Sequence, residues 1–178
     1  MSALARTTRT TFILMGGDVC HFGGSFRPTP YLPLPSPIPS SATLDPHFRT
    51  PCPCSIFTAC HPLEAKNPNT NTPSVASRTT PFYRVSSVPG TYYADPPTAQ
   101  NSIDVLAEFD ADEDVWVCIA HDGGLGDVLA DGGWYPCGNG ANKWKERDWK
   151  ERSRWGFLNE LPVGGKAGRG RLVQGLVR

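Results

Sequence analysis

Two apolar runs in this chain end in the same way, with a metal-capable side chain in a glycine-containing turn. The first run, FILMGGD, ends at Asp18, and the second, VWVCIAHDGG, ends at His121 and Asp122. A carboxylate can bridge two metal ions, and a neutral imidazole nitrogen binds Zn²⁺ or similar ions. Two metal ions about 3.5–4 Å apart can share a hydroxide and polarise a substrate carbonyl or phosphoryl group. The plainer alternatives are that Asp18 or Asp122 shapes a turn and that His121 is an ordinary polar group at a strand end.

The elements around these residues predict a mixed α/β fold. Residues 11–15 and 115–120 are short apolar runs typical of buried strands. Asp95 followed by Pro96 predicts a helix start, and the helix is expected to end near Phe109. We expect one helical turn over residues 125–129 and a last helix over residues 144–161, stopped by Pro162. The order of strand, long loop, helix, strand and helix is typical of the mixed α/β class.

Prolines are concentrated in one segment of the chain. Sixteen of the 18 prolines lie between Pro28 and Pro97. Proline fixes φ and removes a hydrogen-bond donor, so the sequence predicts a long irregular excursion over residues 28–97. Either this segment is a disordered linker, or its large apolar side chains anchor it on a core. The candidate anchors are Phe26, Tyr31, Leu32, Leu34, Ile56, Phe57, Phe82 and Tyr83.

The charges balance overall but are segregated along the chain. Lys plus Arg and Asp plus Glu number 17 each, and the isoelectric point is about 6.9. Residues 104–131 hold nine acids and no bases, whereas residues 143–178 hold ten bases and four acids. We interpret the two blocks as solvated faces that partly complement each other. The alternation of tryptophans and bases in KWKERDWKERSRWGF is compatible with nucleic-acid binding, but an amphipathic helix that buries one indole face is the favoured interpretation.

Cysteines offer two competing sites. The segment CPCSIFTACH places Cys52, Cys54, Cys60 and His61 within ten residues, although its spacing is not that of a usual zinc motif. The alternative is a plain turn. A Cys20–His21 nucleophilic pair is a weaker hypothesis, because neighbours in sequence seldom face each other correctly. The chain has no G-x-S-x-G motif.

Several ordered segments together resemble one family. ILMGGDVCHFGGSFRPTPYLPLP, FDADEDVWVCIAHDGGLGDVL and RWGFLNEL are similar to the C-terminal half of metallo-β-lactamase superfamily proteins, closest to a fungal subgroup of metallo-β-lactamase-domain hydrolases. The resemblance implies that Asp18 is the bridging metal ligand and His121 the last metal-binding histidine, with Zn²⁺ as the metal. It also places Arg27 near the substrate pocket. Intact relatives are expected to activate a metal-bound water for attack on an ester, lactone, thioester or amide.

The chain also departs from that family. The first metal motif of the family, His-x-His-x-Asp-His, does not occur here, and a complete site needs five histidines whereas this chain has four. We therefore expect residues 1–11 to be an unstructured head, residues 12–162 to form part of an αββα sandwich, and residues 163–178 to be a flexible Gly/Arg-rich tail. Function is expected to be that of a truncated or degenerate metal-dependent hydrolase with little turnover alone. The alternative is a non-catalytic half-domain that pairs with another chain or has no function.

Partners and location follow from the same observations. If the chain is active, we expect a small-molecule substrate, and the half-domain is expected to self-associate or to pair with a missing N-terminal half. No apolar run approaches the roughly 18 residues of a membrane span, so no membrane partner is expected. A balanced charge makes nucleic acid an unlikely partner. Reduced cysteines and the lack of a signal-peptide core favour the cytoplasm.

Overall fold

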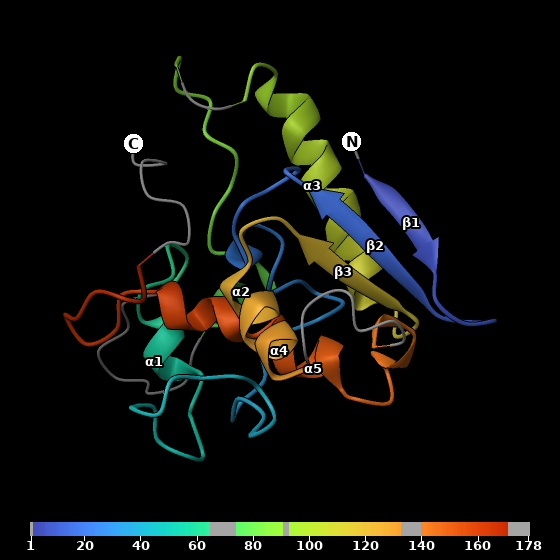
Figure 1. The fold of residues 1–178 in the computed structure, drawn as a ribbon. Coiled ribbons are helices and arrows are strands. Elements are labelled where there is room, and N and C mark those ends of the chain that lie inside the picture. Colours follow the sequence, from blue (N-terminus) through green and yellow to red (C-terminus); the bar gives the residue numbers. More distant parts are fainter. Residues whose placement is uncertain (1, 65–73, 91–92, 133–139, 171–178) are drawn as a thin grey trace.

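A three-stranded mixed sheet forms the centre of the protein. The structure is a computed structural model that describes residues 2–64, 74–90, 93–132 and 140–170. The strands are β1 (Ala3–Arg6), β2 (Phe12–Gly17) and β3 (Val115–Ile119), in the order β1-β2-β3. Strand β2 runs antiparallel to β1 and parallel to β3 (Figure 1). The expected mixed α/β class and both expected strands are therefore confirmed.

Strand β1 lies in the segment that the sequence predicts to be an unstructured head. Leu4 pairs with Leu14 across the β1–β2 ladder. The turn between the strands is held by threonines, because the Thr7 backbone N–H donates to the Thr11 carbonyl at 2.9 Å. The hydroxyls of Thr8 and Thr11 are also 2.6 Å apart. The head is thus ordered by pairing with β2, a tertiary interaction that the small residues of β1 do not signal.

Helix α3 (Pro96–Ala111) connects the two parallel strands and covers one face of the sheet. Asp95 caps it as expected: its carboxylate accepts a hydrogen bond from the Thr98 backbone N–H at 3.1 Å. Proline at the first helical positions costs no intrahelical hydrogen bond. The buried residues at this interface are Leu14, Cys20, Phe26, Ile103, Leu106, Val115, Val117 and Ile119.

Two helices cover the opposite face. Helix α4 (Gly123–Gly132) extends the single turn expected over residues 125–129, and α5 spans Trp149–Arg154. Trp116, Val128, Trp144 and Trp149 form the buried cluster here. The Trp116 indole donates to the Ser153 hydroxyl at 3.3 Å, and the Trp144 indole donates to the Thr7 hydroxyl at 3.2 Å. Strand β3 is therefore buried between two helical layers.

The prediction of one continuous helix over residues 144–161 is wrong. The chain instead forms the 3₁₀ turn η2 (Ala141–Lys143), helix α5, and a second 3₁₀ segment, η3 (Gly156–Glu160). Asp148 has a left-handed backbone with φ of 54°, which no regular right-handed helix allows. At the other end, the backbone of Gly156 packs directly on that of Gly124, and a Cβ on Gly156 would lie 2.4 Å from the Gly124 Cα. Tertiary contact thus interrupts the helical periodicity.

The proline-rich segment is anchored on a core of its own. Its described part forms two short helices, α1 (Ser55–Thr58) and α2 (Val75–Thr79), and is otherwise irregular. Leu34, Phe57 and Phe82 are buried with Phe157 and Leu158 of η3. A further 3₁₀ turn, η1 (Gly23–Ser25), packs Gly23 against Phe157. Tyr31 and Tyr83, by contrast, are exposed.

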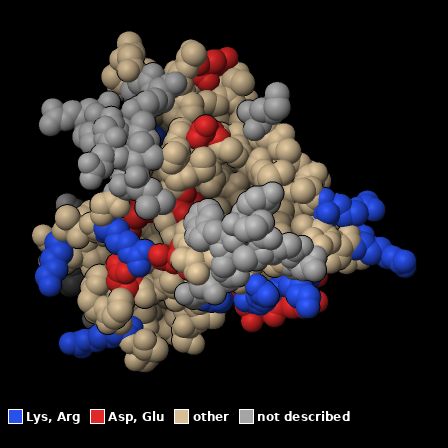
Figure 2. Space-filling model, in the orientation of Figure 1, with Lys and Arg blue, Asp and Glu red and all other residues tan. Residues whose placement is uncertain are grey.

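The acidic and basic blocks pair with each other across the molecule. Lys145 donates to Asp114 at 2.5 Å, and Arg169 donates to Asp127 at 2.6 Å. Basic and acidic side chains accordingly lie interspersed on the face shown in Figure 2. Arg169 belongs to the expected flexible tail, yet its backbone N–H donates to the Asn159 carbonyl at 2.8 Å. Residues 163–170 are therefore packed on the body, and residues 171–178 lie outside the described part.

Helix length also bears on the membrane question. No helix within the described ranges combines the length and the apolar character that crossing a bilayer requires.

Candidate metal centre

Three potential metal-binding side chains converge at the carboxyl ends of β2 and β3. The Asp18 Oδ1 atom lies 3.3 Å from His21 Nε2 and 3.5 Å from His121 Nε2. The two imidazole rings are stacked, with centroids 5.4 Å apart. The structure thus brings together Asp18 and His121, as the sequence predicts, and adds His21. Among the described residues, no other group of three such side chains has ligand atoms this close.

The parallel pairing of the strands positions these residues. Strands β2 and β3 end at the same edge of the sheet, so the turns that follow them are adjacent. The two turns are tied by the Ala120 backbone N–H, which donates to the Gly17 carbonyl at 3.0 Å. A bulge lies between Met15 and Gly17, and Gly17 has φ of 56°, a conformation that glycine adopts at no steric cost. The bulge turns the chain so that Asp18 faces the β3 end.

His121 itself has a left-handed backbone. Its φ is 62°, a value that costs free energy for a residue with a Cβ. Residues held in this region cluster at functional sites, where surrounding structure enforces them. The next residue, Asp122, holds the turn that follows: its carboxylate accepts hydrogen bonds from the backbone N–H groups of Gly124 at 2.9 Å and Leu125 at 3.2 Å.

The three donors are open to solvent and fit a zinc ion. The Asp18 side chain is 70% exposed, and those of His21 and His121 are 30% and 39% exposed. Zinc bonds to nitrogen and oxygen are about 2.0–2.2 Å long, so two ligand atoms in a tetrahedral site are about 3.4 Å apart. The two Asp18–histidine separations of 3.3 and 3.5 Å match that value, and all three ligand atoms lie within 4.8 Å of one another. One carboxylate and two imidazoles are also a donor set that zinc accepts.

Asp122 takes the structural role that the sequence left open. Only 9% of the residue is exposed, and its Oδ1 atom is occupied by the two backbone donors at the start of α4. Burial raises the pKa of the Asp122 carboxyl, although Arg27 and the two hydrogen bonds act in the opposite direction. The metal-site group found among the described residues does not include it.

Arg27, which the resemblance places near a substrate pocket, lies in the interior of this structure. The residue is 2% exposed, and its Nη1 donates to the Arg154 carbonyl at 2.9 Å. Its Nε atom donates to Asp110 Oδ2 at 2.8 Å, and its Nη2 atom donates to Asp110 Oδ1 at 2.7 Å. These contacts leave Arg27 with the role of joining α3 to the proline-rich segment.

The competing cysteine sites are not assembled. The His61 Nε2 atom is 2.9 Å from the Thr80 carbonyl oxygen, to which it is hydrogen-bonded. The His61 Nδ1 atom accepts a hydrogen bond from the Leu63 backbone N–H at 3.0 Å. Both nitrogens are therefore committed, and the described residues contain no metal-type cluster at Cys52, Cys54 and Cys60. Cys20 is fully buried, and burial raises the pKa of its thiol to about 12, which keeps it protonated and unreactive.

The tryptophans likewise follow the plainer interpretation. Trp144, Trp149 and Trp155 are 1%, 3% and 4% exposed. Because stacking on a nucleic-acid base requires an accessible ring face, these side chains serve the core.

Sequence reasoning missed His21 as a member of the site. From the sequence, His21 is considered only as the partner of its neighbour Cys20. The useful signal was its separation of three residues from Asp18, because a turn after a strand brings residues at that spacing close together.

Comparison with known proteins finds relatives named gamma-lactamase and metallo-hydrolase. The chain is 39% identical over 166 residues to Gamma-lactamase FDB1 of Fusarium pseudograminearum, and 32% identical over 163 residues to Metallo-hydrolase mfmC of Annulohypoxylon moriforme. Each alignment covers 90% of this chain. Gamma-lactamase MBL2 of Gibberella moniliformis is 40% identical over 111 residues, 60% of this chain. The chain is a relative of fungal hydrolases of the metallo-β-lactamase family.

The likeness to this family covers only part of each relative. The chain spans 35%, 37% and 39% of the lengths of the three proteins, respectively. No protein-family model matches the chain, and no solved structure matches it. The relationship therefore rests on these pairwise similarities, and one relative's name, Metallo-hydrolase mfmC, implies a metal whose identity the name does not give.

Proposed function

We propose that Asp18, His21 and His121 hold one divalent cation, zinc, in a metal-dependent hydrolase. The single observation that carries this proposal is the convergence of the three donor atoms at the ends of two parallel strands. The name of one relative, Metallo-hydrolase mfmC, supports the proposal. Asp18 is the central ligand of the three, because its Oδ1 atom lies within 3.5 Å of a ring nitrogen of each histidine.

The substrate we propose is a small molecule with a hydrolysable carbonyl, and a lactam in particular. Two relatives are named gamma-lactamases, and a lactam is one of the amides that such chemistry opens. A bound zinc supplies a water of lowered pKa and polarises the carbonyl. The chain's own residues contribute ligand orientation: the Asp122 turn fixes His121, and the Gly17 bulge fixes Asp18.

We further propose that these residues are one portion of a working hydrolase. Three protein ligands are the number that a catalytic zinc usually has, but hydrolysis also needs groups that bind the substrate and move protons. The chain matches about a third of each relative. We therefore assign the substrate-binding and proton-transferring groups to the part of the relatives that this chain does not match. The isolated chain is expected to have little turnover.

A second candidate function is a non-catalytic half-domain that pairs with another chain. Leu4 and Met15 favour it, since these side chains of β1 and β2 are 52% and 47% exposed. Leu4 lies on the edge strand β1 and Met15 on the central strand β2, and exposed apolar residues on a sheet are typical of surfaces that another polypeptide covers.

A chimaera separates the two candidates. The aligned region of Gamma-lactamase FDB1 is replaced by this chain, and opening of a γ-lactam is followed by release of the carboxylic acid. We expect zinc-dependent turnover that Asp18→Ala abolishes and His47→Ala, at an exposed histidine outside the site, leaves unchanged. A folded, inactive chimaera would contradict the hydrolase proposal. Robust turnover by the isolated chain, lost in Asp18→Ala, would contradict its being only a portion of the enzyme.

A further inference from the structure

A cavity separate from the metal centre lies between residues 47–56 of the proline-rich segment and residues 159–169, which begin within η3 and continue beyond it. Its volume is about 490 Å³. Pockets for small molecules usually have volumes of roughly 300–1,000 Å³. Residues of the proposed metal centre do not line it. The cavity therefore has the size of a ligand site and is built from different residues.

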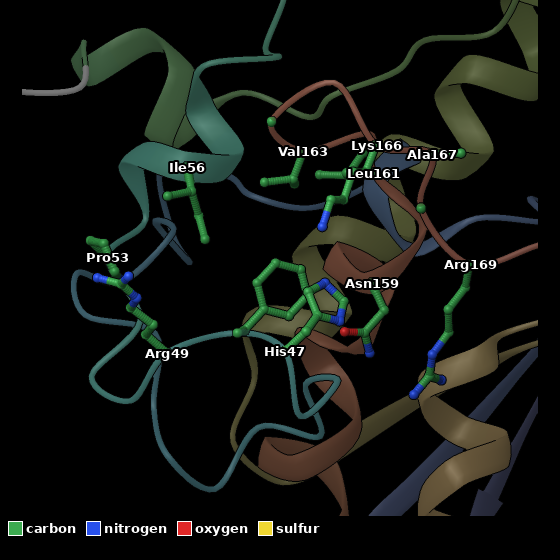
Figure 3. Close-up of a pocket in the computed structure, with 13 residues that line it drawn as sticks. His47, Arg49, Pro53, Ile56, Asn159, Leu161, Val163, Lys166, Ala167 and Arg169 are labelled. Atoms are coloured by element: carbon green, nitrogen blue, oxygen red, sulfur yellow. The ribbon is translucent and has the colours of Figure 1, made fainter.

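The lining of this cavity is apolar and basic. Phe48, Ile56, Leu161 and Val163 supply the apolar surface, and Arg49 and Lys166 supply charge. No acidic side chain occurs among the described residues that line it. Figure 3 shows Lys166 directed into the opening, toward His47 on the opposite wall, with Ile56 facing the same space.

Backbone structure fixes Lys166 at the cavity. The backbones of Val163 and Lys166 exchange two hydrogen bonds, each 3.0 Å long. Between them, Gly164 and Gly165 have φ of 59° and 77°, the pair of positive values that a type I′ turn requires. This tight turn returns the chain over the cavity and presents the Lys166 side chain from a defined position.

Two of the three basic side chains that line the cavity have no acidic partner among the described residues. The third basic residue of the lining, Arg169, is ion-paired with Asp45 and with Asp127. In the described part of the chain, by contrast, neither Arg49 nor Lys166 forms an ion pair of 4.0 Å or less. Of these two cations, Lys166 is the one directed into the opening beside the apolar surface, whereas the Arg49 side chain is turned toward Pro53 (Figure 3).

We propose that this cavity binds a small-molecule carboxylate with an apolar, aromatic or aliphatic, body. The carboxylate would pair with Lys166, because a charge-assisted hydrogen bond to an ammonium is among the stronger polar contacts. The body would lie against Ile56 and Val163. This site is independent of the metal centre, so it does not rest on the proposed function.

Binding of 2-naphthoate to the full 178-residue chain tests the proposal. Its fluorescence is titrated in the presence of a chelator, so that a metal cannot hold the carboxylate. The matched neutral probe is 2-naphthamide, which keeps the ring and loses the charge. We expect naphthoate to bind, and naphthamide to bind about tenfold more weakly or worse, the factor for loss of a charge-assisted contact.

Variants place the probe in the cavity. Lys166→Met keeps the apolar stem and is expected to weaken naphthoate binding about tenfold. The control Lys143→Met removes an exposed lysine that does not line the cavity and is expected to have no effect. Asp18→Ala is also expected to leave binding unchanged. Equal affinity for the two probes, an unaffected Lys166→Met variant, or no naphthoate binding at millimolar concentration would overturn the proposal.

Discussion

The side chains of Arg27 and Asp110 form a buried, two-pronged ion pair between residues 83 positions apart in sequence. The Arg27 side chain is 3% exposed and that of Asp110 is 1% exposed. Burial alone would raise the pKa of Asp110, but the adjoining Arg27, with Arg154 and Lys150, holds that pKa below its usual value. The pair therefore fixes the end of α3 to the start of the proline-rich segment.

Replacing one partner of this pair tests its contribution to stability. Asp110→Asn leaves Arg27 buried without its counter-charge, and we expect a loss of about 3–5 kcal/mol in the free energy of unfolding. Asp122→Asn is the matched control, because an amide oxygen can still accept from Gly124 and Leu125. Urea denaturation measures both. Unchanged stability of Asp110→Asn would contradict the stabilising role of the Arg27–Asp110 pair.

Lys150 gives the protein a specific pH dependence. The residue is 1% exposed, and its Nζ donates to the Val115 carbonyl at 2.6 Å and to the Asp112 carbonyl. Burial and then repulsion by Arg154 lower its pKa from 10.5 to about 8. Between these two values the unfolded chain binds more protons, so the contribution of Lys150 to stability rises with pH.

Comparison with Lys150→Met isolates that contribution, since methionine does not titrate. From about pH 7.5 to about pH 9.5, wild type is expected to gain about 2 kcal/mol in unfolding free energy relative to the variant. Cysteine and tyrosine ionisation affects both proteins and cancels in the difference. Denaturation curves that keep a constant separation across this range would show that Lys150 has an ordinary pKa.

The contact of Gly124 with Gly156 predicts intolerance of any side chain. A Cβ on Gly124 would lie 2.6 Å from the Ser153 carbonyl oxygen and 2.9 Å from the Gly156 Cα. Gly124→Ala is therefore expected to destabilise the protein by at least about 1–3 kcal/mol, the usual cost of overpacking. Gly126→Ala in the same helix meets open space and is expected to be neutral or stabilising. Thermal denaturation compares them, and similar midpoints would refute the close packing.

Anchoring of the proline-rich segment is testable in the same way. Phe57 is fully buried, whereas Tyr31 is 73% exposed. Phe57→Ala is expected to cost about 3–5 kcal/mol, the range for truncating a buried aromatic residue. Tyr31→Ala is expected to change stability by less than about 0.5 kcal/mol. If Phe57→Ala unfolds at the same urea concentration as wild type, the segment is a linker and not part of the core.

The sequence and structure agree where local signals are strong. The apolar run before Asp18 and the Asp95–Pro96 helix start both have short-range physical causes, and both predictions hold. His21 was missed although its spacing from Asp18 is a local signal, because its place in the site also depends on His121, which is distant in sequence. Strand β1 was missed because its order depends on pairing with β2 and not on its own composition. The prediction of one long last helix also failed because of a distant partner, since the break at Gly156 is imposed by its contact with Gly124.

Cobalt binding tests the proposed metal centre most directly. Co²⁺ replaces zinc in tetrahedral sites and gives visible absorption bands that report ligand geometry. The metal-free chain is titrated with Co²⁺ alongside Asp18→Ala, His21→Ala and His121→Ala, with His47→Ala as control. We predict one Co²⁺ per chain with intense tetrahedral bands, lost or strongly weakened in each of the first three variants and retained in His47→Ala. Absence of such bands in wild type, or their persistence in His21→Ala, would contradict the three-ligand centre.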